Sequence, residues 1–355
     1  MPKTSVEPRG SSPDRMVTSS AGSWIRSTMA VAVVAVFVSV LPARAQVRSK
    51  APTLHKPAVE QKTSASKTAQ AKRKVTPAKR TPDPAIPRFK IDETGALVPD
   101  LRAAAAIIYN PLTREVIWEM NSQDQRSIAS ITKLMTAVVV LEGRPSLTEI
   151  VPIRREDTWL ASTTRLRSGD KVSRGDLLQL LLIASDNAAA RALARSSPLG
   201  SLGFVLRMNE KARELGLENT YFADPSGLFS ADVSSAFDIA RLIAYAASDE
   251  RISTIMRKPE ERIWTGRRYV TARSTNALLL RTDLGDVDLK GGKTGFIAKA
   301  GYCFATLLGM PQFNQQVAVV VLGARSNSGR FLETRNLLSW LSLRAPVLFQ
   351  NDGSQ

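Results

Sequence analysis

Residues 130–143 read Ser-Ile-Thr-Lys-Leu-Met-Thr-Ala-Val-Val-Val-Leu-Glu-Gly, and this stretch decides the expected fold. Apolar residues recur in it at the spacing of one helix face: Ile131, Leu134, Met135, Val138 and Val139. The repeat ends at Gly143, a residue type that is common at the carboxyl end of a helix. The sequence therefore predicts an amphipathic helix that opens at Ser130, one turn away from Lys133.

Strand-like segments lie on both sides of this helix in the sequence. Residues 103–109 are apolar, and the Asn110-Pro111 turn signal separates them from an alternating stretch at 115–120, which predicts a β-hairpin. Further strands are expected at 288–294, 301–308 and 316–322, and a closing helix through 332–344. Helical patterns fill the middle of the chain, at 176–184, 188–195, 204–215 and 237–247. This order predicts an α+β fold, with one antiparallel sheet built from both chain ends, flanking helices and a helical insert.

The positive charge of the chain is concentrated ahead of this segment. The 355 residues include 49 Lys or Arg against 32 Asp or Glu. Residues 1–45 hold five basic and two acidic residues, and residues 46–90 hold twelve and two, which leaves residues 91–355 with a net charge of +4. Nucleic-acid binding needs a basic stripe on a folded face, so no nucleic-acid partner is expected.

The amino terminus has the pattern of an export signal. Arg26 precedes an apolar run at 29–41, and Ala43-Arg44-Ala45 follows as a small-residue cleavage site. A run of thirteen residues is short for a bilayer span, so a transmembrane anchor is the lesser interpretation. A start at Met16 would give a signal of ordinary length. We therefore expect a periplasmic or otherwise extracytoplasmic protein.

Residues 46–90 form a predicted tether. They contain six prolines, and Phe89 is their only aromatic residue, so they cannot bury enough apolar surface to offset the entropy of ordering. Two interpretations remain open for the tether. It either attracts anionic envelope polymers or lipid head groups, or it is a soluble spacer.

The inventory of reactive side chains excludes several chemistries. His55 is the single histidine, and Cys303 is the single cysteine. No Ser-His-Asp triad, Cys-His dyad, zinc cluster or internal disulfide can be built from them, so we expect no metal and no other cofactor. A hydrolase of this composition would need Lys, Asp or Glu as its base. Cys303 lies in an apolar strand pattern, which favours a small buried hydrophobe.

Ser130 and Lys133 offer such a chemistry. A lysine can act as a base for a serine nucleophile when burial, a nearby cation and a helix amino terminus lower its pKa. The same helix end could present the Ser130 N–H to a developing oxyanion. The pattern Ser-x-x-Lys is weak alone, because Ser64 with Lys67 and Ser168 with Lys171 also match it.

Two further motifs follow along the chain. Ser185-Asp186-Asn187 interrupts the helical middle, although Ser274-Thr275-Asn276 has the same pattern, and Lys293-Thr294-Gly295 occurs once. Each has an alternative interpretation without catalysis. Ser130 could cap its helix, Asn187 could cap the next one, and Lys293 could be a solvated strand charge. The turn sequence 224–227, Asp-Pro-Ser-Gly, is more typical of a structural turn than of a catalytic element.

Together and in this order, the three motifs resemble those of penicillin-binding proteins and serine β-lactamases. The surrounding sequence is similar to the low-molecular-mass D-alanyl-D-alanine peptidases in four stretches: SITKLMTA at 130–137, GDKV at 169–172, DPSGL at 224–228 and GGKTGFIAKAG at 291–301. The resemblance covers roughly residues 100–345. It implies a division into a signal peptide (1–45), the tether (46–90), a D,D-peptidase domain (91–345) and a tail (346–355).

The resemblance also implies a role for each motif residue. Ser130 would attack a D-alanine carbonyl of a peptidoglycan stem peptide, and Lys133 would accept its proton. Ser185 would relay a proton to the leaving amine, and Asn187 would hold the substrate amide or the lysine.

In the third motif, Lys293 and Thr294 would bind the substrate carboxylate, and Lys293 would help to keep Lys133 neutral. Gly295 is small enough to let a substrate backbone pair with the strand edge. The N–H groups of Ser130 and Phe296 would form the oxyanion hole. β-Lactams are expected as covalent inhibitors.

The sequence alone leaves several functions open. Only 60 residues follow Gly295, which leaves no room for the additional carboxy-terminal domain of many carboxypeptidases in the family that this sequence resembles. The resemblance therefore favours a cross-link-cleaving D-alanyl-D-alanine endopeptidase over a carboxypeptidase. A β-lactamase is less favoured, because no Glu between Ser185 and Lys293 has the class A context. Two functions of a different class stay open as well: a non-catalytic envelope-binding protein, and an electrostatic binder that acts through the tether.

Overall fold

The computed structural model describes residues 87–280 and 286–349, all within the unit Pro77–Gln355. The predicted signal peptide and the tether up to residue 86 lie outside the described residues. The described chain begins with β1 (Phe89–Ile91), which pairs antiparallel with β2 (Leu97–Pro99). Within residues 87–280 and 286–349, no helix is long and apolar enough to cross a bilayer.

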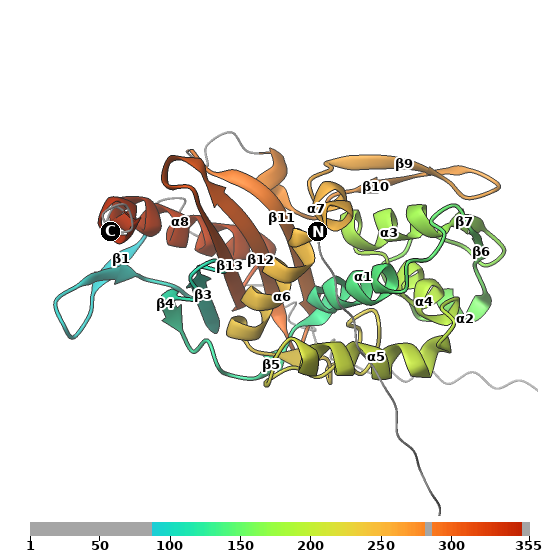
Figure 1. Cartoon of the computed structure of the whole chain (residues 1–355), viewed down its shortest axis with the longest axis horizontal. Coiled ribbons are helices and arrows are strands. Elements are labelled where there is room, and N and C mark those ends of the chain that lie inside the picture. The colour runs from blue at the N-terminus through green and yellow to red at the C-terminus, as the bar shows by residue number, and fades with distance from the viewer. Residues whose placement is uncertain (1–86, 281–285, 350–355) are drawn as a thin grey trace, which may run out of the picture. The chain divides into compact units, whose positions relative to one another are not determined.

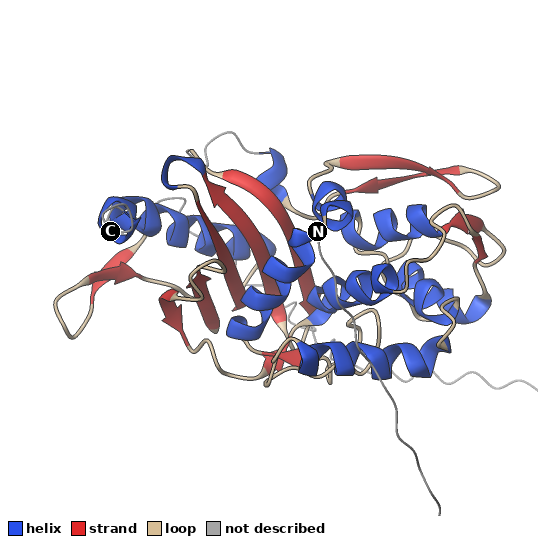
Figure 2. Ribbon diagram, viewed as in Figure 1, coloured by secondary structure: helices blue, strands red, loops and turns tan. Residues whose placement is uncertain are grey.

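A five-stranded sheet with the order β11-β12-β13-β3-β4 forms the centre of the fold (Figure 2). Its strands are β3 (Ala105–Tyr109), β4 (Val116–Met120), β11 (Asp288–Ile297), β12 (Gly301–Met310) and β13 (Gln315–Ala324). All four pairings are antiparallel, and β3 joins the early hairpin to β13. The predicted α+β fold, with one sheet assembled from distant parts of the chain, is confirmed.

Helices cover both faces of this sheet (Figure 1). Strand β13 shows how, because its side chains alternate between two clusters: Val317, Val319 and Val321 pack with α8 (Asn327–Phe349), whereas Ala318, Val320 and Leu322 belong to the cluster that contains α6 (Ala236–Ser248). Burial on both faces explains why this strand is a continuous apolar run. The helix α8 extends to Phe349, into the segment predicted as a tail.

The helical part lies beside the sheet and surrounds α1 (Lys133–Glu142). Around it lie α3 (Arg174–Ile183), α4 (Asn187–Arg195) and α5 (Gly200–Glu214). The prediction that this first helix opens at Ser130 was wrong by one turn, because residues 129–132 form a 3-10 turn that leads into α1. Ala129 has a positive φ of 49°, so the chain bends sharply just before Ser130.

Several short elements were not predicted. They are β5 (Arg126–Ser127), β6 (Ile150–Pro152), α2 (Arg155–Thr158), β7 (Lys171–Ser173), β8 (Val233–Ser234), α7 (Glu250–Met256), β9 (Glu260–Trp264) and β10 (Tyr269–Arg273). They are too short to give a strong periodic signal. The β9–β10 hairpin turns Ile263 and Ala272 inward and leaves its other face exposed.

Cys303 is buried in β12 and is a free thiol. Burial raises the pKa of this thiol to about 11, so it is uncharged and packs as a small hydrophobe, as predicted.

Candidate active site

The three sequence motifs come together where α1, the α3–α4 junction and the edge strand β11 meet. Lys133 Nζ donates to Ser130 Oγ at 3.0 Å. The same amine donates to Asn187 Oδ1 at 2.6 Å. Lys293 Nζ donates to Ser185 Oγ at 2.8 Å. Residues that are 54 and 108 positions apart in the sequence therefore form one polar cluster.

The amine of Lys133 is the centre of this cluster and is completely buried. Its third hydrogen bond goes to the Ser226 carbonyl. Burial lowers the pKa of Lys133 to about 7. The carboxylates of Asp224 and Asp186 oppose that change, and Asp232 adds to their effect when it is ionised. The cation of Arg191 adds to the lowering. Burial is thus the main cause of the neutral form, whereas the family resemblance had pointed to Lys293.

Lys293 is a second buried amine with a different environment. Besides Ser185, it donates to the Thr294 carbonyl at 2.9 Å. Burial lowers its pKa well below the usual value, and the cations Lys133 and Arg330 add to this effect. Lys293 is therefore not the solvated strand charge that one interpretation of the sequence allowed. Ser185, its partner, has a positive φ of 57°, which turns the chain sharply between α3 and α4.

Asn187 is the first residue of α4, but it does not cap that helix. The cap is Asp186, whose carboxylate accepts from the Ala189 N–H. The Asn187 side chain lies between Lys133, which it accepts from, and the Ala161 carbonyl, to which Nδ2 donates at 2.6 Å. Its amide orientation is fixed at both ends, so Asn187 orients the lysine.

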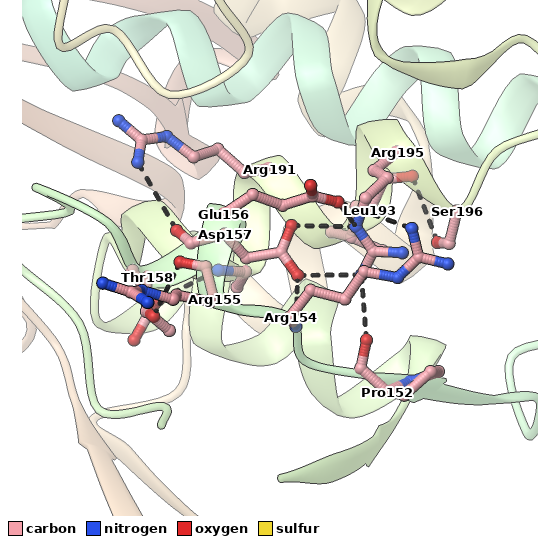
Figure 3. A network of polar contacts seen from close by, with 12 residues as sticks. Pro152, Arg154, Arg155, Glu156, Asp157, Thr158, Arg191, Leu193, Arg195 and Ser196 are labelled. Atoms are coloured by element: carbon pink, nitrogen blue, oxygen red, sulfur yellow. Dashed lines mark hydrogen bonds and ion pairs between the residues drawn. The ribbon is translucent and has the colours of Figure 1, made fainter. Parts of the chain in front are cut away.

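The loop that carries Ala161 is held by charged groups (Figure 3). Asp157, buried in α2, accepts from Arg195 of α4 at both carboxylate oxygens, with distances of 3.0 and 2.8 Å. Arg191, about one turn earlier on α4, donates to the Trp159 carbonyl at 2.6 Å. The bidentate pair of Asp157 and Arg195 fixes α2 against α4. It thereby also fixes the loop that binds the Asn187 side chain.

Gly295 brings β11 against the backbone of Ser130. A Cβ atom at Gly295 would lie 2.6 Å from the Ile128 carbonyl oxygen and 3.1 Å from the Ser130 nitrogen. No larger residue fits without displacing one of these segments. Phe296 follows on the edge strand, half exposed, with its ring stacked on Tyr302.

The turn from Asp224 to Gly227 lies against the same site, although its sequence is more typical of a structural turn than of a catalytic element. Its Ser226 carbonyl accepts from Lys133, 93 positions earlier in the chain. Gly227 has a φ of 76°, and a Cβ atom there would overlap the Ala129 carbonyl. The family resemblance included DPSGL at 224–228, but neither the resemblance nor the turn composition indicated what this turn contacts.

A pair of buried carboxyl groups supports this turn. Asp224 accepts from the Ser226 hydroxyl at 2.6 Å and from the Phe229 N–H at 2.8 Å, and these bonds lower its pKa although burial opposes them. Burial and the neighbouring Asp224 carboxylate raise the pKa of Asp232 to about 8. The pair therefore holds one proton at neutral pH, which limits the negative charge near Lys133.

In the part of the chain that the structure describes, the other matches to the Ser-x-x-Lys and Ser-x-Asn patterns do not contribute a nucleophile or a base to this site. Ser64 and Lys67 lie outside the described residues, and Ser168 and Lys171 are exposed near β7. The second Ser-x-Asn pattern lies close to the site through its middle residue, because the hydroxyls of Thr275 and Thr294 are 2.6 Å apart. Nothing in the sequence pattern distinguished Thr275 from any other threonine.

Solved structures with the same fold support this arrangement. The crystal structure of the Streptomyces K15 DD-transpeptidase superposes with a TM-score of 0.62 at 26% sequence identity, over 68% of this chain and 97% of that one. The fold is therefore that of the penicillin-binding D,D-peptidases.

Sequence comparison is more specific. The family model described as D-alanyl-D-alanine carboxypeptidase matches residues 92–326. A D-alanyl-D-alanine endopeptidase of Pseudomonas aeruginosa is 35% identical over 68% of this chain and 78% of its own length, and one of Escherichia coli is 34% identical over 70% and 80%. The chain therefore belongs to this family of serine-type D-alanyl-D-alanine peptidases.

Proposed function

We propose that the protein cleaves the D-alanyl bond of peptidoglycan cross-links through an acyl-enzyme on Ser130. The observation that carries the proposal is the buried Lys133 amine, 3.0 Å from the Ser130 hydroxyl. With a pKa of about 7, this amine is partly neutral at neutral pH and accepts the hydroxyl proton as the oxygen attacks.

The oxyanion that forms in the attack needs donors from the backbone. The N–H groups of Ser130 and Phe296 are the proposed pair, one from the 3-10 turn and one from β11. The close approach of β11 at Gly295 to the Ser130 nitrogen supports this pairing. Removal of one such donor in other enzymes costs about 3 kcal/mol of barrier.

The proposal assigns Ser185 to the leaving group and Lys293 to the substrate carboxylate. The Ser185 hydroxyl accepts from Lys293 and relays a proton to the departing amine. The pKa of Lys293 is lowered by burial and by the cations Lys133 and Arg330, and among the residues that the structure describes no carboxylate opposes this change. A substrate carboxylate that approaches Lys293 and Thr294 therefore raises that pKa and binds as one half of an ion pair. Water then releases the acyl group.

The endopeptidase assignment is favoured over a carboxypeptidase assignment by the names of the relatives with 35% and 34% identity. A carboxypeptidase, the activity named in the family description, cleaves the same type of bond. Both activities imply peptidoglycan stem peptides as substrates and β-lactams as covalent inhibitors. Because this substrate lies outside the cytoplasm, the enzyme acts in the periplasm or another extracytoplasmic space, and the predicted signal 1–45 provides its export.

Covalent labelling tests the nucleophile. A fluorescent penicillin labels the purified protein, and Ser130→Ala removes the label while the thermal unfolding midpoint stays unchanged. Ser168→Ala is the matched control, because Ser168 belongs to the exposed second match to Ser-x-x-Lys and its loss leaves labelling intact. Labelling that persists in Ser130→Ala contradicts the assignment.

Product analysis separates the two peptidase activities. The protein is incubated with cross-linked and with uncross-linked muropeptides, and the products are identified by mass spectrometry. Conversion of dimers to monomers is expected for the endopeptidase, whereas loss of a terminal D-alanine from monomers alone indicates the carboxypeptidase. Steady hydrolysis of penicillin without trapping would indicate a β-lactamase instead.

A further inference from the structure

Exposed cations gather around the loop 163–171, which begins beside the Ser185–Asn187 turn of the active site. Four side chains belong to this cluster: Arg165, Arg167, Lys171 and Arg267. The loop and the turn of the β9–β10 hairpin are joined by two hydrogen bonds of 2.8 Å, from the Lys171 N–H to the Thr265 carbonyl and from Arg268 Nη2 to the Arg165 carbonyl. The Arg267 guanidinium lies over Gly169.

The cluster is not neutralised by the described part of the protein. Across residues 87–280 and 286–349, no carboxylate forms an ion pair with the four side chains, and the one acid of the loop, Asp170, is buried and paired with Arg268. Several cations elsewhere on the domain are paired with carboxylates, among them Arg195, Arg207, Lys211 and Arg251. Like charges gathered without counter-charges repel one another and attract an anionic ligand.

This cluster is continuous with the active site. The Asn187 N–H donates to the Thr163 carbonyl at 2.9 Å, and the Arg165 N–H donates to the Asp186 carboxylate at 2.5 Å. The segment 163–165 therefore has the Ser185–Asn187 turn on one side and the hairpin on the other. A polymer with one peptide in the cleft has its neighbouring groups within reach of the cluster.

Two aromatic residues flank the cations on the outer face of the hairpin. Trp264 and Tyr269 are the last cross-strand pair before the turn, with ring centroids 4.9 Å apart and exposed fractions of 48% and 56%. The Arg262 guanidinium lies 4.2 Å from the Tyr269 ring centre and holds that ring in place. Exposed, ordered aromatic rings offer flat apolar faces on which sugar rings can stack.

We propose that Arg165, Arg167, Lys171, Trp264, Arg267 and Tyr269 form a second binding surface, the hairpin surface, for the peptidoglycan strand whose peptide occupies the active site. The cations bind free carboxylates of neighbouring stem peptides, and the aromatic pair stacks on sugar rings of the strand. Charge complementarity selects this occupant, because stem peptides are acidic and the site beside the surface acts on them. The inference rests on the proposed function and adds the recognition of the polymer to it.

The test compares polymeric with small substrates in the full-length protein. In the variant R165Q/R167Q/R267Q, kcat/KM for cleavage of cross-links in intact peptidoglycan at low ionic strength is expected to fall about tenfold. This is the lower end of the range by which electrostatic steering raises association rates. Acylation by penicillin, which is too small to reach the hairpin surface, is expected to change less than twofold. Added salt reduces the difference between variant and wild type, because it screens exposed charges.

Matched controls separate the surface from total charge. The variant R114Q/R144Q/R213Q removes the same charge from exposed positions on other elements and is expected to cleave intact peptidoglycan at the wild-type rate. Trp264→Ala is expected to slow cleavage of glycan-linked substrate and to leave cleavage of sugar-free cross-linked peptides unchanged. Equal losses in the two charge variants overturn the proposal, as does an unaltered rate on intact peptidoglycan in R165Q/R167Q/R267Q.

The outcomes distinguish this inference from the proposed function. If wild-type protein fails to cleave isolated cross-linked muropeptides, the proposed function fails, whatever the variants do. If it cleaves them and the hairpin-surface variant still processes intact peptidoglycan normally, only the second surface is refuted. Loss of binding to vesicles of phosphatidylglycerol, with peptidoglycan cleavage unchanged, would assign the surface to a membrane and also overturn the proposal.

Discussion

Lys133 and Lys293 are two buried amines with the same kind of partner and opposite surroundings. Each donates to a serine hydroxyl, Lys133 to Ser130 at 3.0 Å and Lys293 to Ser185 at 2.8 Å. Carboxylates surround Lys133 and oppose the lowering of its pKa, whereas cations lie near Lys293 and add to the lowering. The two amines thus share a serine partner but differ in the charged groups that surround them.

This difference indicates how one site can give two lysines different tasks. Burial alone disfavours the charged form of both amines. The carboxylates near Lys133 limit this effect and leave its pKa at about 7, where an amine can both accept and return a proton. Lys293 lacks such neighbours, so it gains most from a negative charge that arrives with the substrate.

Replacement of Lys133 is the strongest way to test this comparison. Lys133→Ala is expected to slow penicillin acylation by about 10²–10⁴-fold, because the proton acceptor is lost. The second-order labelling rate measures this, with circular dichroism to verify folding. Lys299→Ala, at an exposed position after β11, is the control and should label normally. A loss of less than tenfold in Lys133→Ala would remove Lys133 from the role of base.

Asp232→Asn tests the carboxyl pair behind Lys133. The folded pKa of about 8 is above the usual value of 3.8, so the folded state holds an extra proton between these values and loses stability as pH rises towards 8. Asparagine keeps an acceptor for the N–H groups of Ala223 and Asp224 and cannot ionise.

We therefore expect the free energy of unfolding of Asp232→Asn, relative to wild type, to rise between pH 5 and pH 9 by on the order of 3 kcal/mol. Urea unfolding at both pH values measures the change. A relative stability that is independent of pH would mean that Asp232 is already ionised at pH 5.

Lys293→Ala should have a smaller effect than Lys133→Ala. The loss of one charge-assisted hydrogen bond corresponds to about 1.5–3 kcal/mol, or roughly 10- to 150-fold, and should appear mainly in KM for substrates that end in a carboxylate. A variant that lowers kcat as much as Lys133→Ala does would contradict the division of tasks.

The pH dependence of wild-type acylation is the mildest test, because each pH unit changes the acylation rate by only about tenfold. Lys133 must be uncharged to act, so the second-order rate with penicillin should fall about tenfold per pH unit below pH 7 and level off above it. Stopped-flow labelling between pH 5 and pH 9 measures the profile. A midpoint near pH 10 would mean that burial does not lower the pKa of Lys133.

The sequence predicted much of this arrangement from local patterns. The Ser130–Lys133 pair was predictable because residues three apart on a helical turn are neighbours regardless of the remaining chain. The sheet was predictable because β12 and β13 are long and strongly apolar. The start of α1 was placed one turn too early, since a positive φ at Ala129 leaves no mark in the composition of the segment.

By itself the sequence limited which chemistry is available: with one histidine and one cysteine, a hydrolase needed Lys, Asp or Glu as its base, and the spacing of Ser130 and Lys133 favoured the lysine. The tertiary structure decided the protonation state of Lys133. Its burial, the Ser226 carbonyl 93 positions away and the proton shared by Asp224 and Asp232 arise only when distant segments pack together. Local patterns fix which atoms are present and which are helical neighbours. A pKa, by contrast, depends on every charge and on the water excluded around it, and both are properties of the folded chain.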